Sequence, residues 1–541
     1  MKSIAKYIRR HLRRHAPQYI VLLAAMAVVF NFPAQGAFGA DGKPDTGFKI
    51  KGYEITGNTI FPADKLRETA APFTGTGKTA SDVEKARDAI EKLFHDAGYP
   101  AVMVNIPEQT LKDGIVKLEV IESRIGKVEV TGNRFFTSEG LLRELPALAP
   151  GQILYWPDVK DQIDRLNRNQ DVKIEPVMTP GDKMGVVDVE LKTDDRLPLH
   201  GYLEINNRNS PETKPLRLNA MVRYDNLWQR SNSIAFQLQT DPQDLHETGA
   251  LGISYSLPSP LNKDHELVVY SVWSNSNVAF GEGFTVVGKG YEAGMRYAIP
   301  LPPHKLYSHN ITLGVDYKHF NQVTGSSGNS TTVPITYVPL AFSYNASLPD
   351  KGGITQFSAG VNLAFRGVGT NEGEFEFKTF QSKANYLYAT LGVQRTQTLP
   401  HGMGLFMKVD GQAANESLID NEQYVAGGME SVRGYREDEA AGDDAVHGTV
   451  ELSFPDPLEK SATGKWLHSS PFIFYDIADL TIQNPLPGQM GSIKMEGVGA
   501  GMRGSITKNA EYEVDWALAL DPTDQIHRDD QRIYFKLKAT L

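Results

Sequence analysis

Two glycine-rich stretches of the sequence have spacings that could hold a nucleotide. Gly75-Thr-Gly-Lys-Thr79 has the Lys-Thr end of a phosphate-binding loop, and Gly499-Ala-Gly-Met-Arg-Gly504 has the glycine spacing of a dinucleotide fingerprint. Pro72 stands where the first glycine of a phosphate loop belongs, and a helix rather than a strand is expected before it. The second stretch lies in an alternating segment with no helix after it. We therefore expect no nucleotide site at either stretch.

Other catalytic and metal-binding patterns are missing from the sequence. Its 13 histidines include no His-Glu-x-x-His pattern, and there is neither a Gly-x-Ser-x-Gly elbow nor a coherent metal cluster. With no cysteine, the chain forms neither disulfides nor thiolate metal sites. A net charge of -10 excludes a strongly basic nucleic-acid binder. We predict no catalysis, no cofactor, no metal and no nucleic-acid partner.

Two further stretches place charged groups in notable positions. Tyr424-Val-Ala-Gly-Gly-Met-Glu-Ser-Val-Arg-Gly-Tyr435 lies in a long gap between expected strands, at residues 421–446. Pro471-Phe-Ile-Phe-Tyr-Asp476 is a strand in which Asp476 shares a face with Phe472 and Phe474. Asp476 would be a poor lipid-facing residue. From the residues alone, the favoured interpretation is that Arg433 is an ordinary loop arginine and Asp476 a solvated lumen carboxylate.

The N-terminus has the order of a secretory signal peptide. Six basic residues precede an apolar run from Tyr19 to Phe32, and small residues follow up to Ala40. The run is shorter than a membrane-spanning helix needs, so a membrane anchor is the weaker alternative. We assign residues 1–40 to the signal peptide and 41–47 to a short linker.

A repeat follows, with a spacing of 75 residues. Ile55-Thr-Gly-Asn-Thr-Ile-Phe61 returns as Val130-Thr-Gly-Asn-Arg-Phe-Phe136, which implies two copies of one small domain. Each copy shows the order β-α-α-β-β, and Ser81-Asp-Val-Glu84 predicts a capping box before the second helix of the first copy. Both copies resemble POTRA domains, at residues 48–122 and 123–194, with turns formed by Thr56, Gly57, Asn58, Thr131, Gly132 and Asn133.

Residues 197–541 show period-two alternation and no convincing helix. In the last segment Ile533, Phe535 and Leu537 would face lipid, and Tyr534 and Lys536 the lumen. A transmembrane sheet must close because lipid offers no partner to edge N–H and C=O groups. We predict a 16-stranded antiparallel transmembrane β-barrel, with a soluble β-sandwich array as the alternative. Its strands would start near Leu199, Lys214, Asn232, Thr248, His265, Phe284, Leu306, Val333, Gly353, Phe380, Gly402, Val446, Phe472, Ser492, Glu511 and Asp530.

The 424–435 and 471–476 stretches resemble the paired signatures of two-partner secretion transporters (the TpsB group, of ShlB/FhaC/HecB type). These proteins carry a Val-Arg-Gly-Tyr/Phe loop and a Phe-x-Asp-x-Gly strand. The resemblance implies that the loop folds into the lumen and that Arg433 pairs with Asp476. The neighbouring motif positions are Val432, Gly434, Tyr435, Phe472, Phe474 and Ala478, the last standing where the family has glycine.

The resemblance also implies a function. The chain would be an outer-membrane pore with periplasmic POTRA domains that secretes, and in some systems activates, one large partner exoprotein: an adhesin, a cytolysin or a contact-dependent toxin. Its other partner would be outer-membrane lipid, and we expect a monomer. The POTRA sheets leave edge strands that could accept an extended peptide, unless a neighbouring domain covers them. The alternatives are a barrel-assembly factor of the same superfamily, a diffusion porin or, least favoured, an outer-membrane enzyme.

Overall fold

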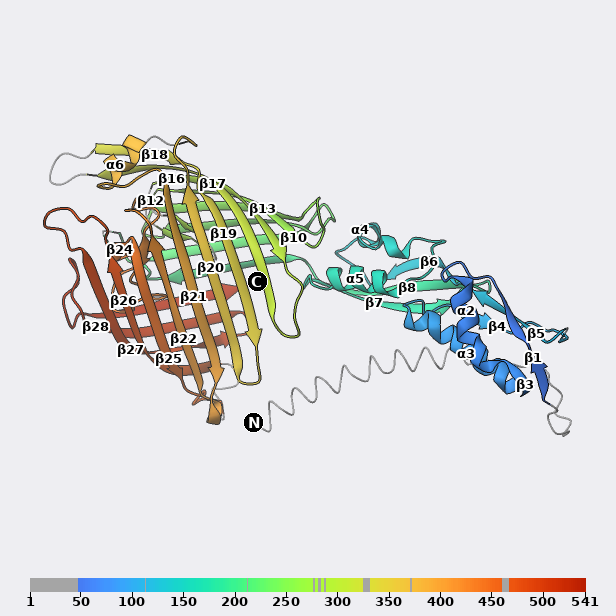
Figure 1. The fold of residues 1–541 in the computed structure, drawn as a ribbon. Helices are drawn as coiled ribbons and strands as arrows, with labels where there is room; N and C mark the ends of the chain where they lie inside the picture. Colours follow the sequence, from blue (N-terminus) through green and yellow to red (C-terminus); the bar gives the residue numbers. More distant parts are fainter. Residues whose placement is uncertain are drawn as a thin grey trace. The chain divides into compact units, whose positions relative to one another are not determined.

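The chain divides into two units, residues 1–195 and 196–541, in a computed structural model (Figure 1). The structure describes residues 47–111, 113–211, 213–275, 278–280, 284–286, 289–324, 331–369, 372–459 and 467–541. The predicted signal peptide lies outside these residues. No helix among them has the length and apolarity needed to cross a membrane.

The first half of the first unit is a three-stranded sheet of order β2-β5-β4, backed by two helices. Its elements are β1 (Phe48–Ile50), β2 (Gly52–Thr56), α2 (Ala63–Ala70), η1 (Ala71–Phe73), β3 (Gly75–Lys78), α3 (Ala80–Asp96), β4 (Met103–Asn105) and β5 (Ile115–Ile121). Alternate apolar residues of β5 pack against the helical residues Ile90 and Phe94, which are fully buried. The Gly75-Thr79 stretch supplies strand β3, which pairs with β1.

The helix start in this half differs from the prediction. α3 begins one residue before Ser81, and its capping box is formed by Thr79 and Asp82 rather than by Ser81 and Glu84. The Thr79 N–H donates to Asp82 Oδ2 over 3.0 Å. This hydrogen bond to the charged form lowers the pKa of Asp82.

The second half repeats the topology of the first. Its sheet has the order β6-β8-β7, parallel between β6 and β8 and antiparallel between β7 and β8, as in β2-β5-β4. Helix α5 lays Val159 and Ile163 on this sheet. The elements are β6 (Arg124–Thr131), α4 (Ser138–Arg143), η2 (Pro146–Leu148), α5 (Trp156–Leu166), β7 (Val172–Pro180) and β8 (Val186–Asp195).

The second unit is a closed antiparallel barrel, because its last strand, β29, pairs with its first, β9. The prediction of sixteen strands is confirmed. The wall consists of β9 (Leu199–Asn206), β10 (Arg217–Leu227), β11 (Asn232–Asp241), β12 (Asp244–Pro258), β13 (Glu266–Ser274), β16 (Gly290–Pro300), β17 (Ser308–Thr324), β18 (Thr331–Tyr337) continued by β19 (Leu340–Pro349), β20 (Gly353–Ala364), β21 (Tyr386–Thr398), β22 (Gly404–Ala414), β25 (Asp444–Ser453), β26 (His468–Thr481), β27 (Ser492–Thr507), β28 (Ala510–Ala519) and β29 (Gln531–Thr540).

β18 and β19 are two parts of one wall strand. Both pair with β17, and they are separated only by residues 338 and 339. Pro339 has no N–H to give to the ladder, but its carbonyl still accepts from the Asp316 N–H over 3.1 Å. The interruption therefore leaves the barrel closed.

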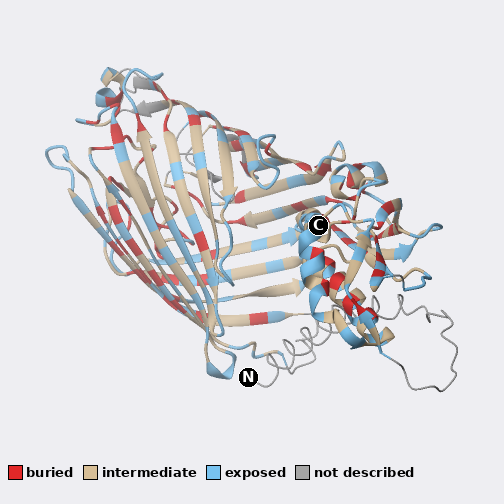
Figure 2. Ribbon diagram, turned by 45° about the vertical axis from the view of Figure 1, so that its right-hand side comes forward, coloured by how far each residue is buried: buried red, intermediate tan, exposed pale blue. Residues whose placement is uncertain are grey.

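Burial alternates along the wall strands, which Figure 2 shows as short bands of different colour. In β29, Ile533 is 60% exposed whereas its neighbour Tyr534 is fully buried. Large apolar side chains alternate outward in the same way on β26, at Ile473 and Tyr475. The period-two pattern thus separates a lipid face from a lumen face.

Three expectations for the barrel segment were wrong. A helix does form after residue 197, α6 (Glu372–Lys378). Phe375 lies between the rings of Tyr337 and Tyr386, so packing against distant residues stabilises this helix although its sequence has no helical periodicity. The wall strand expected near Phe380 begins at Tyr386 as a result. Phe284 belongs to a hairpin of β14 (Val278–Phe280) and β15 (Phe284–Val286), and the wall resumes only at β16.

Candidate functional site

The long connection between β22 and β25 carries the Arg433 stretch. Two short strands within it, β23 (Tyr424–Ala426) and β24 (Ala440–Gly442), pair with each other as an antiparallel hairpin. Residues 427–439 form the tip between them. Gly434 has a φ of 108°, and a Cβ there would lie 2.9 Å from the Ala519 nitrogen of the barrel wall. Glycine is therefore required both for the tip's backbone and for its close approach to β28.

Arg433 reaches Asp476 on β26 through one edge of its guanidinium, formed by Nε and Nη2. Nε donates to Asp476 Oδ2 over 2.7 Å and Nη2 to Oδ1 over 2.9 Å, which is the bidentate geometry. The Arg433 backbone N–H also donates to Oδ2, over 3.1 Å. Asp476 is fully buried and Arg433 is 5% exposed. The structure thus brings together the two charged groups that the resemblance paired.

Two further carboxylates surround the same guanidinium. Arg433 Nη1 donates to Glu451 Oε2 on β25 over 3.2 Å, and lies 3.7 Å from Asp515 Oδ2 on β28. Glu451 also accepts from Arg503 on β27. Among the described residues, neither oxygen of Asp515 has a hydrogen-bond donor. The sequence did not indicate Glu451 or Asp515, because their nearness to Arg433 depends on strand register.

Aromatic rings complete the environment of this charge. The Arg433 guanidinium lies 3.4 Å from the centroid of the Phe474 ring, and that of Arg503 lies 3.9 Å from the Phe472 ring. Both phenylalanines are buried on the inward face of β26. The strand motif therefore supplies a carboxylate for the charge and ring faces for the flat guanidinium.

The residues beside Arg433 attach the tip to β28 and β29. Tyr534 Oη accepts from the Gly434 N–H over 2.9 Å and donates to the Tyr435 carbonyl. Tyr435 Oη donates to the Asp521 carbonyl over 2.7 Å. Val432 and Tyr435 are fully buried in a cluster that includes Ala478, so alanine fits at the position where the family pattern has glycine.

A row of glycines on β27 makes room for the tip. Gly497, Gly499 and Gly501 alternate on the inward face. A Cβ at Gly497 would stand 1.9 Å from the Arg433 carbonyl oxygen, and Cβ atoms at Gly499 and Gly501 would collide with the rings of Phe474 and Phe472. The stretch that resembled a dinucleotide fingerprint is thus part of wall strand β27, where the missing side chains leave space for the tip and for the rings of Phe472 and Phe474. The spacing of these glycines at every second residue is typical of one face of a strand.

The start of the long connection is held by a separate polar cluster. Glu422 accepts from Lys318 Nζ over 2.9 Å, from Tyr337 Oη over 2.6 Å and from Tyr388 Oη over 2.8 Å. Lys378 of α6 packs nearby, and burial lowers its pKa to about 8 against the attraction of Asp420 and Glu422. This attachment was not foreseen, since its members come from four separate segments.

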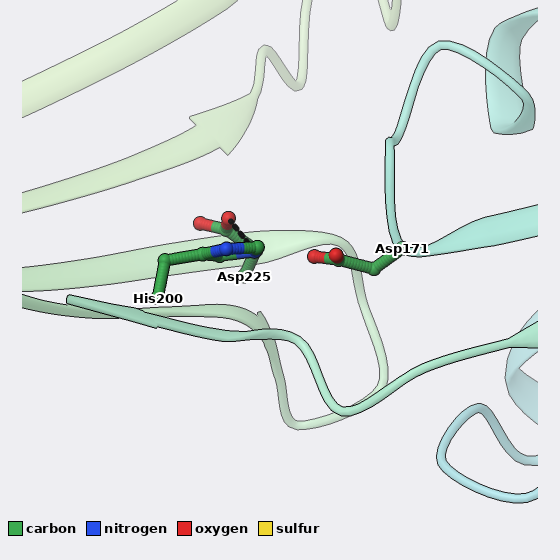
Figure 3. A group of neighbouring side chains, drawn as sticks. All are labelled: Asp171, His200 and Asp225. Carbon is green, nitrogen blue, oxygen red and sulfur yellow. Dashed lines mark ion pairs between the residues drawn. The ribbon is translucent and has the colours of Figure 1, made fainter. Parts of the chain in front are cut away.

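The β9–β10 connection also contacts the tip. Arg208 Nε donates to Glu437 Oε1 over 2.9 Å, and Arg208 Nη1 lies 2.5 Å from Glu430 Oε1. At the other end of the same strands, His200 on β9 and Asp225 on β10 form an ion pair with 3.3 Å between Nε2 and Oδ2 (Figure 3). Asp171, drawn in the same figure, belongs to the first unit.

The Thr-Gly-Asn turns of the first unit have matching environments. A Cβ at Gly57 would lie 2.2 Å from the Val120 carbonyl oxygen, and one at Gly132 would lie 2.4 Å from that of Thr193. The side chains of Asn58 and Asn133 each donate to the carbonyl three residues on. Thr56 and Thr131 end the strands that precede the turns.

Each turn is followed by backbone N–H groups that a carboxylate accepts. Glu122 accepts from the Ile60 N–H over 3.1 Å, and Asp195 accepts from the Phe136 N–H over 2.8 Å. Glu122 directly follows β5, and Asp195 is the last residue of β8, so the two carboxylates stand at the ends of the last strands of their copies. The turn residues hold each small domain together.

Comparisons with known proteins agree with this architecture. A family model described as POTRA domain, ShlB-type, matches residues 48–123. A second, described as haemolysin secretion/activation protein ShlB/FhaC/HecB, matches residues 185–504, more than half of the chain.

Relatives and solved structures point the same way. Outer membrane transporter CdiB of Dickeya dadantii is 23% identical over 68% of this chain and 66% of its own length, and heme/hemopexin transporter protein HuxB of Haemophilus influenzae is 20% identical over 94% and 89%. The structure of CdiB from Escherichia coli superposes with a TM-score of 0.62 at 15% identity, covering 100% of this chain and 99% of that one. BamA from Haemophilus ducreyi, without its POTRA domains 1–3, gives 0.55 at 16% identity over 91% of this chain and 100% of that one.

The barrel places the protein in the outer membrane, with its POTRA domain in the periplasm. With the family model covering most of the barrel and a ShlB-type POTRA domain before it, the chain belongs to the haemolysin secretion/activation family ShlB/FhaC/HecB.

Proposed function

We propose that this protein is the outer-membrane pore of a two-partner secretion system and that it exports one large partner exoprotein. The observation that supports this most directly is a loop arginine buried against the inner wall of a closed barrel, at 2.7 Å from Asp476. The family match and the transporter names of CdiB and HuxB support the same activity. The exoprotein would be an adhesin, a cytolysin or a contact-dependent toxin.

In this proposal the exoprotein arrives unfolded and docks on the periplasmic sheets by strand addition. The outer strands of the two sheets, β4 and β2 in the first and β7 and β6 in the second, have one side without a partner strand within their own sheets. We infer that residues 123–194 are a second POTRA domain, from their identical strand order. No nucleotide energy is available in the periplasm, so folding of the exported chain outside the cell would drive the process.

The Arg433 tip would act as a lock that holds the loop on the wall in the resting state. The bidentate hydrogen bonds of the Arg433 guanidinium to Asp476 and the hydrogen bond of its backbone N–H to the same carboxylate favour the docked position. The exported chain would have to offer compensating contacts, or enter beside the docked tip. The protein would act as a monomer in outer-membrane lipid and would have no catalytic activity.

The test is secretion in cells that lack this chain and then regain it. We expect one large exoprotein to disappear from the medium and return on complementation, with unchanged amounts of other outer-membrane barrels. Depletion of the other barrels would indicate an assembly factor instead. Uptake of small solutes without any exported protein would indicate a porin, and hydrolase activity of the purified chain would contradict the expected absence of catalysis.

A further inference from the structure

Among the described residues, one patch of the lumen wall on four neighbouring wall strands carries no charged side chain of its own, and Arg296 of β16 lies at its edge, against Gly314. Directly paired residues of neighbouring strands share a face, and alternate residues of a strand lie on opposite faces. The register joins Asn310 of β17 to Asn345 of β19, Asn345 to Ser358 of β20, and Ser358 to Gly392 of β21. One face is therefore formed by every second residue of four segments, counted from the first residue of each: 308–314, 343–347, 356–362 and 390–396. We name this face the neutral strip. Its residues are all serine, threonine, asparagine, glutamine or glycine.

The opposite face of these strands identifies the strip as the inward one. Leu313, Phe342 and Leu391 occupy the intervening positions and are 38%, 44% and 68% exposed. Exposed apolar side chains at every second position form the lipid-facing surface of a transmembrane barrel. The neutral strip must then face the lumen.

The neutral strip is open rather than covered by the long connection. A cavity of about 550 Å³ is lined by its residues, among them Asn345, Gln356 and Ser358, and reaches Lys408 and Asp410 at one side. The tip of the loop is attached elsewhere, on β26 to β29. The strip therefore borders the free part of the lumen.

The chemistry of the neutral strip suits one class of ligand. Every residue of an extended polypeptide presents an N–H and a C=O, except at proline, and side-chain hydroxyls and amides can both donate and accept. Each such hydrogen bond contributes only about 0.5–1.5 kcal/mol net. The strip can therefore satisfy the polar backbone groups of a passing polypeptide without binding any one segment tightly. Charged walls would instead retain segments of opposite charge. Four strands about 4.8 Å apart give a strip about 14 Å wide, wider than the roughly 10 Å of one strand layer.

We propose that the neutral strip is the track along which an extended, unfolded polypeptide crosses the barrel, past a loop whose tip stays docked on the other wall. This rests on the proposed export function and adds the side of the lumen and the chemistry of contact. It separates two tasks: the charged wall holds the tip of the loop, and the neutral strip guides the exported chain.

The absence of cysteine allows a direct test by disulfide trapping in the full-length protein. Single variants Ser358→Cys on the strip, Gln237→Cys on the inward face of β11 and Phe357→Cys on the lipid face are reconstituted in bilayers. The probe is an unfolded 30-residue peptide (about 100 Å when extended) of serine, glycine and threonine with one cysteine. Labelling with a water-soluble maleimide checks that the two lumen positions are accessible.

We expect trapping at Ser358→Cys to be about tenfold faster than at Gln237→Cys, because proximity raises the effective concentration, and none at Phe357→Cys. Equal or faster trapping at Gln237→Cys would overturn the track while leaving the pore function intact. No trapping at either lumen position, with both accessible to maleimide, would overturn the track and count against the export function as well.

Discussion

The two sides of the lumen differ in charge and in burial. On β25 to β28 the inward residues include Glu451, Asp476 and Asp515, all buried beneath the loop tip. On β17 to β21 the neutral strip has no charged residue and borders open space. Burying a charged side chain costs free energy unless a partner of opposite charge lies in the right geometry. The buried carboxylates of the first side therefore suit the Arg433 tip and few other groups. An uncharged polar surface has no such preference.

This difference shows how one barrel can hold a docked loop in its lumen and still leave a path for an exported polypeptide. A single ion pair with good geometry holds a short segment in one place, whereas many weak hydrogen bonds tolerate a sliding chain of changing sequence. The loop's start adds a third arrangement, with Glu422 held by Lys318 and two tyrosines. Predictions that disturb one side and spare the other can break or sharpen this comparison.

Reversing the charge at Asp476 should have the largest effect. Asp476→Arg places two guanidinium groups together in a buried site, and loss of a buried pair costs about 3–5 kcal/mol, or a shift of two orders of magnitude or more in the docking of the loop. We expect export to fail while the barrel still inserts, measured by secreted exoprotein and by heat-modifiable migration of the folded barrel. Asp479→Arg is the matched control on the same strand, since Asp479 is exposed. Undiminished secretion from the Asp476→Arg variant would rule out the lock.

Adding one methyl group at Gly497 should displace the tip without changing any charge. The new Cβ of Gly497→Ala would overlap the Arg433 carbonyl oxygen at 1.9 Å, and a backbone atom cannot move aside alone. We expect raised single-channel conductance and faster proteolysis of the loop. Gly448→Ala is the control, because its nearest neighbour would be 3.5 Å away. A closed channel in both variants would show that the tip tolerates a shift.

Neutralising Glu451 should weaken the docking of the tip less than the changes at Asp476 and Gly497. Glu451→Gln keeps an oxygen but loses the charge that Arg433 and Arg503 share, a loss of about 1.5–3 kcal/mol for a charged hydrogen bond. Conductance should rise by less than in Gly497→Ala. Glu513→Gln is the control, because Glu513 pairs with Lys536 and Arg503 of the wall and not with the loop. If the control opens the channel equally, general lumen charge rather than the Arg433 contact sets the closed state.

The sequence allowed the strand number, the repeat and the two motif stretches to be predicted, because each has a local pattern. Glu451, Asp515 and Gly497 were missed since they meet Arg433 only through the register of β25, β27 and β28. Helix α6 was missed for the same kind of reason. Its seven residues have no helical periodicity, and Phe375 is fixed by aromatic rings from distant strands.

The smallest effect should come from a conservative change on the neutral strip. Asn345→Ser retains a donor and an acceptor, and Asn345 is exposed to the lumen, so stability should change by no more than about 0.5 kcal/mol. Export should continue at the rate of the unmodified protein, measured by exoprotein released over time. Because a tolerant wall is what distinguishes guidance from specific recognition, a loss of export as large as in Asp476→Arg would mean that this wall also binds one particular sequence. The contrast between the two sides of the lumen would then disappear.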